Sequence, residues 1–139
     1  MSLLKVLVAD DDPDVLDLHR LNLESHYQLV LARDGREAWE LFEKERPRCV
    51  VTDLNMPGLN GQELTERIRM HPRLSSVPII ILTGTTVDTD LPAGFWRIGT
   101  KADVFLEKPV SPEELLQAIR RQILLAARIQ PLPPGKGFY

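Results

Sequence analysis

Short apolar runs alternate along the chain with segments in which apolar residues recur at helical spacing. A run that is apolar at successive positions is typical of a strand buried on both faces of a parallel sheet. The alternation therefore predicts an α/β fold with a parallel sheet of five strands. The predicted strands cover residues 3–9, 28–32, 49–53, 77–83 and 103–107.

A residue suited to capping a helix precedes each clear helical pattern. Asp12 is followed by a proline, which is favoured at the first helical position. Asp34, Asn60 and Ser111 each have a glutamate three residues later, which is the spacing of a capping box. These signals predict helices over residues 13–26, 35–46, 61–71 and 112–129.

A fourth crossover between residues 84 and 102 has three glycines and one proline, so any helix there is expected to be short. Right-handed crossovers leave few arrangements for five parallel strands. The common doubly wound, flavodoxin-like order is 2-1-3-4-5, with helices on both faces of the sheet. In that order the first and third strands are neighbours, and ligands bind where their carboxyl ends meet.

Composition fits one globular domain, predicted over residues 1–129, followed by a proline- and glycine-rich tail or linker over residues 130–139. The chain has 17 Lys and Arg against 20 Asp and Glu, and its net charge of -3 gives no reason to expect direct nucleic-acid binding. The first ten residues lack the long apolar stretch of a signal peptide. We therefore expect a cytoplasmic protein without a membrane partner.

Carboxylates gather at the predicted ligand-binding edge, since Asp10 and Asp11 follow the first strand and Asp53 ends the third. Two such charges about 4 Å apart repel by roughly 4 kcal/mol at an effective dielectric near 20, so the pocket must take up protons or hold a cation. Oxygen ligands favour Mg²⁺. The alternative is that these aspartates only lead into the first helix, but this leaves Asp53 unexplained.

The fourth and fifth strands also end in polar residues at this edge, namely Thr83 and Lys108. Such a set suits phosphoryl transfer, in which a carboxylate acts as nucleophile while a metal and a lysine offset the charge on the transferring oxygens. Asp53 is the natural nucleophile in this interpretation. Thr83 has a simpler alternative as an ordinary strand end, and Lys108 as a solvated charge.

Four segments, "LVADDDPD", "VVTDLNMPGLNG", "IILTG" and "FLEKPV", resemble the signature segments of the response-regulator receiver domain, and the resemblance spans about residues 4 to 128. It implies that Asp53 takes a phosphoryl group from a histidine kinase or phosphotransfer protein. It also implies that Asp10, Asp11 and Asp53 hold Mg²⁺ together with the backbone carbonyl of Asn55. Many receiver domains have a cis bond before the proline that follows Lys108.

The same resemblance implies roles for further residues around the phosphoacceptor. Thr83 corresponds to the hydroxyl that bonds the phosphoryl group, and Lys108 to the cation that pairs with it. Phe105 corresponds to the aromatic switch residue, although an ordinary core ring is the alternative. Asn55 and Thr85 are expected to tune the lifetime of the phosphoryl group.

The function implied is that of a bacterial two-component phosphorelay regulator, not an enzyme beyond its own phosphorylation and dephosphorylation. It would signal to a downstream partner or output domain, and the chain would be a stand-alone receiver or a piece of a longer regulator. The alternative is a degenerate receiver that binds partners without phosphorylation. A third alternative is a phosphatase with an aspartyl nucleophile. Such an enzyme would be expected to have a second acid at position 55, where this chain has an asparagine.

The predicted last helix has an apolar stripe that should face the sheet, formed by Leu115, Ile119, Ile123 and Ala126. Leu124 and Leu125 lie off this stripe and have Arg120, Arg121 and Arg128 around them. This surface is a candidate for partner binding or for a homodimer that forms on phosphorylation, and single exposed leucines are the alternative. Of the remaining residues, Cys49 and Trp39 are expected to be packed, and His19, His26 and His71 to lie at the surface.

Overall fold

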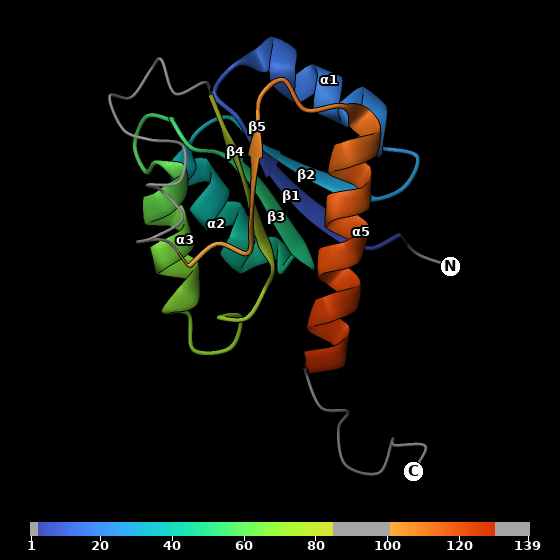
Figure 1. Ribbon diagram of the computed structural model, residues 1–139. Coiled ribbons are helices and arrows are strands. Elements are labelled where there is room, and N and C mark those ends of the chain that lie inside the picture. Colours follow the sequence, from blue (N-terminus) through green and yellow to red (C-terminus); the bar gives the residue numbers. More distant parts are fainter. Residues whose placement is uncertain (1–2, 85–100, 130–139) are drawn as a thin grey trace.

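A parallel sheet forms the centre of the computed structural model, which describes residues 3–84 and 101–129 (Figure 1). Its strand order is β2-β1-β3-β4-β5, and every neighbouring pair is parallel. The predicted doubly wound order is therefore confirmed. The strands are β1 (Lys5–Ala9), β2 (Gln28–Ala32), β3 (Cys49–Asp53), β4 (Ile79–Thr83) and β5 (Val104–Glu107).

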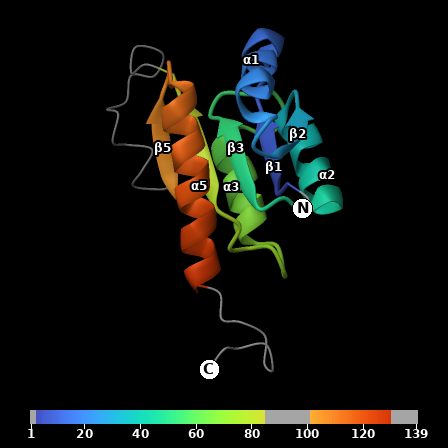
Figure 2. The same cartoon turned by 90° about the vertical axis from the view of Figure 1, so that its right-hand side faces the viewer.

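Helices cover both faces of this sheet, with α1 and α5 on one side and α2 and α3 on the other (Figures 1 and 2). Their bounds are Pro13–Leu23 for α1, Gly35–Glu45 for α2, Gly61–Arg69 for α3 and Pro112–Ile129 for α5. The weak helix expected between residues 84 and 102 falls almost wholly outside the described residues, as does the predicted tail over residues 130–139. Among the helices of the described ranges, none combines the length and the apolar character needed to cross a membrane.

Successive residues of the central strands enter different layers of the core, which explains why these runs are apolar at every position. Leu7 of β1 packs under α2 and α3 with Phe42 and Leu64, whereas its neighbour Val8 packs under α1 and α5 with Ile119. All five side chains are almost completely buried. The sheet thus carries one apolar cluster on each face.

The predicted caps are present at the four helix starts. The side chain of Asp12 accepts from the amide of Asp14, and that of Asp34 accepts from the amide of Glu37. Asn60 and Glu63 form a complete capping box, and the amide of Glu114 donates to Ser111 Oγ at 3.1 Å. Each cap follows the carboxyl end of a strand, directly or after a loop. The caps therefore set where each helix begins at the edge of the sheet formed by the carboxyl ends of the strands.

Helices α1, α2 and α3 end one to three residues earlier than their patterns suggest. At the end of α2, for example, Arg46 has a positive φ of 49° and its amide still donates to Phe42 O. The left-handed conformation stops the helix one residue before the predicted limit and lets the chain turn toward β3. Hydrophobic periodicity continues through such a turn, so it does not mark the boundary.

Candidate functional site

Three carboxylates converge where β1 and β3 end. The two strands pair in parallel with Ala9 opposite Thr52, so Asp10 and Asp53 leave the sheet at the same edge. One carboxylate oxygen each from Asp10, Asp11 and Asp53 lies within 4.8 Å of the others. The structure therefore brings together the three acids that the sequence placed at this edge.

The three carboxylates differ in burial. Asp10 is 1% exposed and Asp53 is 8% exposed, whereas Asp11 is open to solvent. Asp10 Oδ1 accepts from the amide of Asp12 at 2.9 Å, which links the acidic loop to the start of α1. Two nearly buried carboxylates side by side are unfavourable without a compensating cation.

Lys108, which lies 98 positions after Asp10 in the chain, supplies such a cation. Its Nζ lies 3.1 Å from Asp10 Oδ2 and 3.3 Å from Asp53 Oδ2, and so bridges the two buried acids. Its amide donates to Thr83 O at 2.8 Å, which carries the β4–β5 pairing to the edge of the sheet. The peptide bond between Lys108 and Pro109 is cis.

Burial and the attraction between Asp53 and Lys108 have opposite effects on the pKa of each of these two residues. Burial raises the pKa of Asp53, the attraction of Lys108 opposes this, and the repulsion of Asp10 adds to the increase. For Lys108, burial acts to lower the pKa, but its two carboxylate partners outweigh burial and the pKa is raised. The lysine is therefore held in its charged form next to the two carboxylates that it contacts.

The loop after β3 is shaped by two glycines. Gly58 has a φ of +81°, which L side chains rarely adopt. A Cβ on Gly61 would lie 2.5 Å from the backbone oxygen of Asp53, so α3 can begin against the strand end only because this residue lacks a side chain. Asn55 lies exposed within this loop. The loop thus folds back against the backbone at the end of β3.

Two further predicted site residues, Thr83 and Phe105, lie on the strands β4 and β5. Thr83 is the last residue of β4, is half-buried, and pairs with Glu107 of β5. Phe105 lies opposite Ile81 and packs, partly buried, against the apolar cluster under α2 and α3. Thr85 lies outside the described residues.

The prediction of a surface position is wrong for His19, which is only 6% exposed. This residue shares the buried stripe of α1 with Leu16 and Leu23, at spacings of three and four that sequence inspection could have detected. Burial lowers the pKa of His19. The attraction of Asp10 opposes this decrease, and the repulsion of Lys108 adds to it. Its Nε2 is buried without a hydrogen-bond partner in the described structure.

The other two histidines, Trp39 and Cys49 lie closer to where the sequence predicts them. His26 is exposed, but His71 is half-buried, accepts from two backbone amides through Nδ1, and contacts the Trp39 ring edge-on. Trp39 also stacks on Phe42, which confirms that it is packed. Cys49 is completely buried, and burial raises the pKa of its thiol to about 12, as expected of an unreactive core residue.

The acids at the edge of the sheet fit a divalent cation that prefers oxygen ligands. Carboxylate oxygens from Asp10, Asp11 and Asp53 are close enough together to share one ion. Two of the three are buried and one is exposed, which leaves an approach from solvent. With Lys108 beside them, the site offers both a nucleophilic carboxylate and positive charge, which are the elements that phosphoryl transfer requires.

Comparison with known proteins gives one consistent family. Residues 6–120 match the family model of the response regulator receiver domain. A protein of Leptolyngbya boryana, described as an uncharacterized 14.6 kDa protein in the sodA1 3' region, is 37% identical over 125 residues, which cover 89% of this chain and 93% of that protein. Response regulator GtcR of Aneurinibacillus migulanus is 34% identical over 119 residues, or 85% of this chain.

The extent of these matches differs. The chain covers 47% of GtcR and about half the length of several further regulators that it matches. Among solved structures, the receiver domain of the sensor histidine kinase PA1611 from Pseudomonas aeruginosa has a TM-score of 0.77 and 27% identity, with 88% of this chain and 98% of that chain covered. That structure is described with a magnesium ion coordinated in the active site cleft.

Proposed function

Because the chain belongs to the response regulator receiver domain family, we propose that it is a phosphoacceptor switch of two-component signalling whose acceptor is Asp53. One observation carries this proposal: the nearly buried Asp53 carboxylate ends β3 with Lys108 Nζ 3.3 Å from its Oδ2 and two further carboxylates alongside. The chain acts as a regulator that receives a group, and not as a classical enzyme that turns over a substrate.

In the proposed transfer, a carboxylate oxygen of Asp53 attacks the phosphorus of a phosphohistidine on a partner kinase or phosphotransfer protein. The new O–P bond forms as the P–N bond breaks, and the electron pair stays on the imidazole nitrogen, which takes up a proton. Lys108 is placed to stabilise the charge on the phosphoryl oxygens, because its Nζ already contacts Asp53. Its charge also opposes protonation of the nucleophile.

The acidic cluster supports the proposal of a Mg²⁺ cofactor. Asp10, Asp11 and Asp53 would hold the ion through carboxylate oxygens, and Asn55 through its backbone carbonyl. When bound, Mg²⁺ would neutralise charge on the phosphoryl group and orient it. The cluster itself is the support from this chain, since nearly buried Asp10 and Asp53 need positive charge beyond that of one lysine.

The edge of the sheet next to Asp53 suggests how phosphorylation is read. Thr83, at the end of β4, is proposed to bond the phosphoryl group through its hydroxyl, and Phe105 of β5 to change its packing in response. Asn55 and Thr85 are proposed to tune how long the phosphoryl group persists. A downstream protein or an attached output domain would then read the changed surface.

The experiment that tests this function is phosphate incorporation from acetyl phosphate in the presence of Mg²⁺, followed by intact mass spectrometry. The wild-type chain is expected to gain an alkali-labile phosphoryl group, and Asp53→Asn to gain none because the nucleophile is gone. Asp14→Asn is the matched control, since Asp14 is exposed in the first turn of α1 and should leave labelling unchanged. Labelling of Asp53→Asn at the wild-type level would remove Asp53 from the proposal.

The degenerate alternative, a receiver that binds partners without phosphorylation, is not favoured. Such a module would not require a nearly buried carboxylate pair bridged by a lysine, as Asp10, Asp53 and Lys108 are here. The arrangement costs desolvation and repulsion that an interaction module would have no reason to retain.

A further inference from the structure

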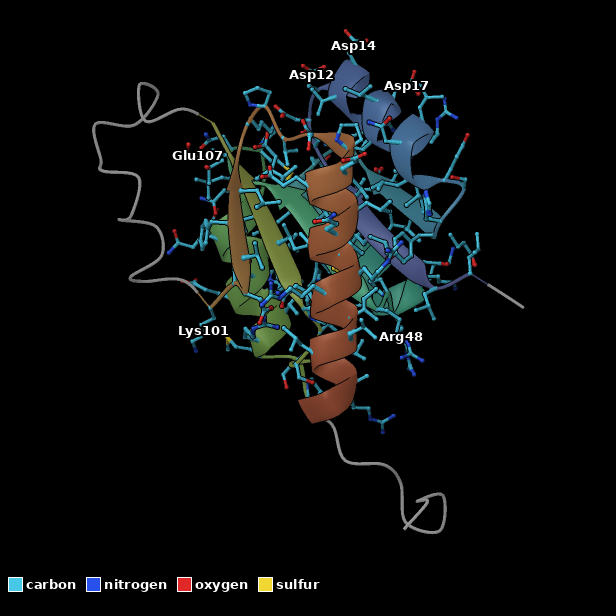
Figure 3. All side chains as sticks on the ribbon, turned by 45° about the vertical axis from the view of Figure 1, so that its right-hand side comes forward. Asp12, Asp14, Asp17, Arg48, Lys101 and Glu107 are labelled. Atoms are coloured by element: carbon cyan, nitrogen blue, oxygen red, sulfur yellow. The ribbon has the colours of Figure 1, made fainter. Side chains whose placement is uncertain are left out.

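Several basic residues lie at the end of the sheet opposite the phosphoacceptor. Figure 3 shows Asp12, Asp14 and Asp17 at the end where the phosphoacceptor lies, and Arg48 and Lys101 toward the other end. The second end is formed by the amino ends of the strands and the connections that lead into them. Arg48 and Lys101 lie at this end together with two acidic residues, Glu45 and Asp103.

A pocket at this second end is lined by three arginines from separate segments. Arg46 follows α2, Arg48 precedes β3, and Arg73 lies in the connection between α3 and β4. The backbone beneath each is held in place: the amide of Arg48 donates to Lys5 O at 2.8 Å, for example, and that of Arg73 to His71 Nδ1 at 3.1 Å. The three arginines thus line the pocket from ordered backbone.

These arginines have no ion-pair partner within residues 3–84 and 101–129. Glu45, which precedes Arg46 in the chain, pairs instead with Lys5 at 3.1 Å. Asp103, at the same end of the sheet, pairs with Arg69 at 2.8 Å. The pocket is therefore lined by three arginines that make no ion pair with the described residues, which favours an anion.

The rest of the lining is largely apolar. Val77 and Pro78 are buried residues leading into β4, and Ile123, Ala126 and Ala127 come from the last turns of α5. The pocket has a volume of about 310 Å³, which lies in the range of sites for small ligands. A ligand that fits both parts of this lining must carry an anionic group and an apolar body.

We propose that this pocket binds a small phosphate monoester with an apolar substituent. Three guanidinium groups offer more N–H donors than the two oxygens of a carboxylate can accept, whereas a phosphate monoester has three strongly accepting oxygens and nearly two negative charges. The apolar substituent would lie against Val77, Pro78 and Ile123. The site goes beyond the phosphoacceptor function, because it shares no residue with the Asp53 edge.

The test is a titration of the ¹⁵N-labelled chain with phenyl phosphate, followed by NMR in the presence of a chelator so that metal at the acidic site plays no part. Saturable chemical-shift changes are expected for the amides of Arg48, Ser76 and Val77. The dissociation constant of phenyl phosphate should be about 1 mM or lower, which corresponds to a binding free energy of at least about 4 kcal/mol in magnitude. Inorganic phosphate, which lacks the apolar body, should bind about fivefold more weakly.

Variants assign the binding to the pocket. Arg48→Ala and Arg73→Ala should each weaken phenyl phosphate binding about fivefold or more, because each removes a charged donor. Ala127→Glu keeps a good helix former on α5 and should abolish binding by placing a carboxylate at the pocket. Arg36→Ala is the control, since Arg36 is an exposed arginine in the first turn of α2 at the opposite end of the sheet.

Three outcomes would overturn the proposal. The first is no saturable binding of phenyl phosphate, and the second is that Arg48→Ala and Arg73→Ala bind it as tightly as the wild type does. The third is that the wild type binds inorganic phosphate as tightly as phenyl phosphate. Tight binding of a single-stranded oligonucleotide with no response to phenyl phosphate would also reject a small-molecule site. Thermal unfolding of each variant shows that it is folded. Acetyl phosphate labelling of Asp53 should be unchanged in all of them, so failure here is distinguishable from failure of the phosphoacceptor proposal.

Discussion

The Asp53 carboxylate is nearly buried between a second acid and a lysine, so its charged form is costly in the folded protein. Its pKa is raised chiefly by burial, which means that the folded state binds this proton more tightly than the unfolded state does. The stabilising effect of the proton is fully present below the ordinary pKa and is lost as pH rises through the folded-state pKa. The wild-type protein therefore loses this stabilisation as the Asp53 carboxyl ionises.

From this we predict that Asp53→Asn, measured by urea unfolding in the presence of a chelator, raises the free energy of unfolding at about pH 7 by on the order of 1 kcal/mol. The gain should disappear at about pH 3, where the wild-type carboxyl is protonated in both states. Asp14→Asn, at an exposed position, should not raise the free energy of unfolding at about pH 7. A loss of stability in Asp53→Asn at neutral pH would mean that the attraction of Lys108 outweighs burial.

The exposed Asp11 gives a way to test the metal proposal without changing the nucleophile. Removing one of three oxygen ligands in Asp11→Ala should weaken Mg²⁺ binding about tenfold, measured by calorimetric titration, and lower the rate of labelling at limiting Mg²⁺. Asp14→Ala serves as the control for loss of a nearby exposed charge. Unchanged Mg²⁺ affinity in Asp11→Ala, or an unchanged labelling rate in excess chelator, would contradict the assignment.

Among the helices, α5 has two distinct faces. Leu115 and Ile119 are buried against the sheet as their spacing predicts, and Ile123 is partly buried beside them. Leu124 is 59% exposed, and with Leu125 it lines a shallow pocket that also includes Gln117, Arg120 and Arg121. The predicted apolar surface with basic neighbours is therefore present, and whether a partner covers it stays a prediction.

We predict that Leu124→Glu leaves labelling of Asp53 unchanged but weakens self-association or partner binding of the phosphorylated chain. The physical reason is that a carboxylate at this position would be desolvated in any apolar contact. Leu21→Glu is a matched control, because Leu21 is a similarly exposed leucine, 61% exposed, on α1. Sedimentation with and without a phosphoryl mimic measures the effect, and identical behaviour of Leu124→Glu and wild type would reject this surface for self-association.

For the molecule as a whole, Arg69 connects segments that are distant in the chain. Its guanidinium donates to the backbone oxygens of Ser75, Val77 and Lys101 and to Asp103 Oδ2, at 2.6 to 3.0 Å. Asp103 Oδ2 also accepts from the amide of Ile79. One mostly buried side chain thus joins α3, the start of β4 and the approach to β5.

Arg69→Met keeps the length and apolar stem of this side chain but leaves several of its acceptors without a donor. We predict a loss of about 2–4 kcal/mol in the free energy of unfolding, measured by urea denaturation. Arg67→Met, two residues earlier on α3, removes only an arginine that lies 5.5 Å over the Trp39 ring. That control should cost less than about 1 kcal/mol. Equal losses in the two variants would show that the Arg69 contacts add no stability beyond that of a surface residue.

Much of the fold was predictable because its signals are local. The apolar runs predict β1 to β5 since a strand buried on both faces needs apolar residues at successive positions. Caps such as Asn60 with Glu63 predict helix starts because the bonds that they make span only three residues. Helix ends were less well predicted, since a turn such as that at Arg46 depends on backbone conformation and not on periodicity.

The position of Asp10 just after one strand and of Asp53 at the end of its neighbour could be predicted from the sequence, because a parallel topology brings the carboxyl ends of the strands to one edge. The 3.1 Å contact of Lys108 with Asp10, which lies 98 positions earlier in the chain, could be seen only in the folded structure, as could the burial that raises the pKa of Asp53. The same is true of the pocket that joins Arg48 to Arg73. Such distances depend on register and side-chain packing between separate elements, which no local pattern of residues specifies.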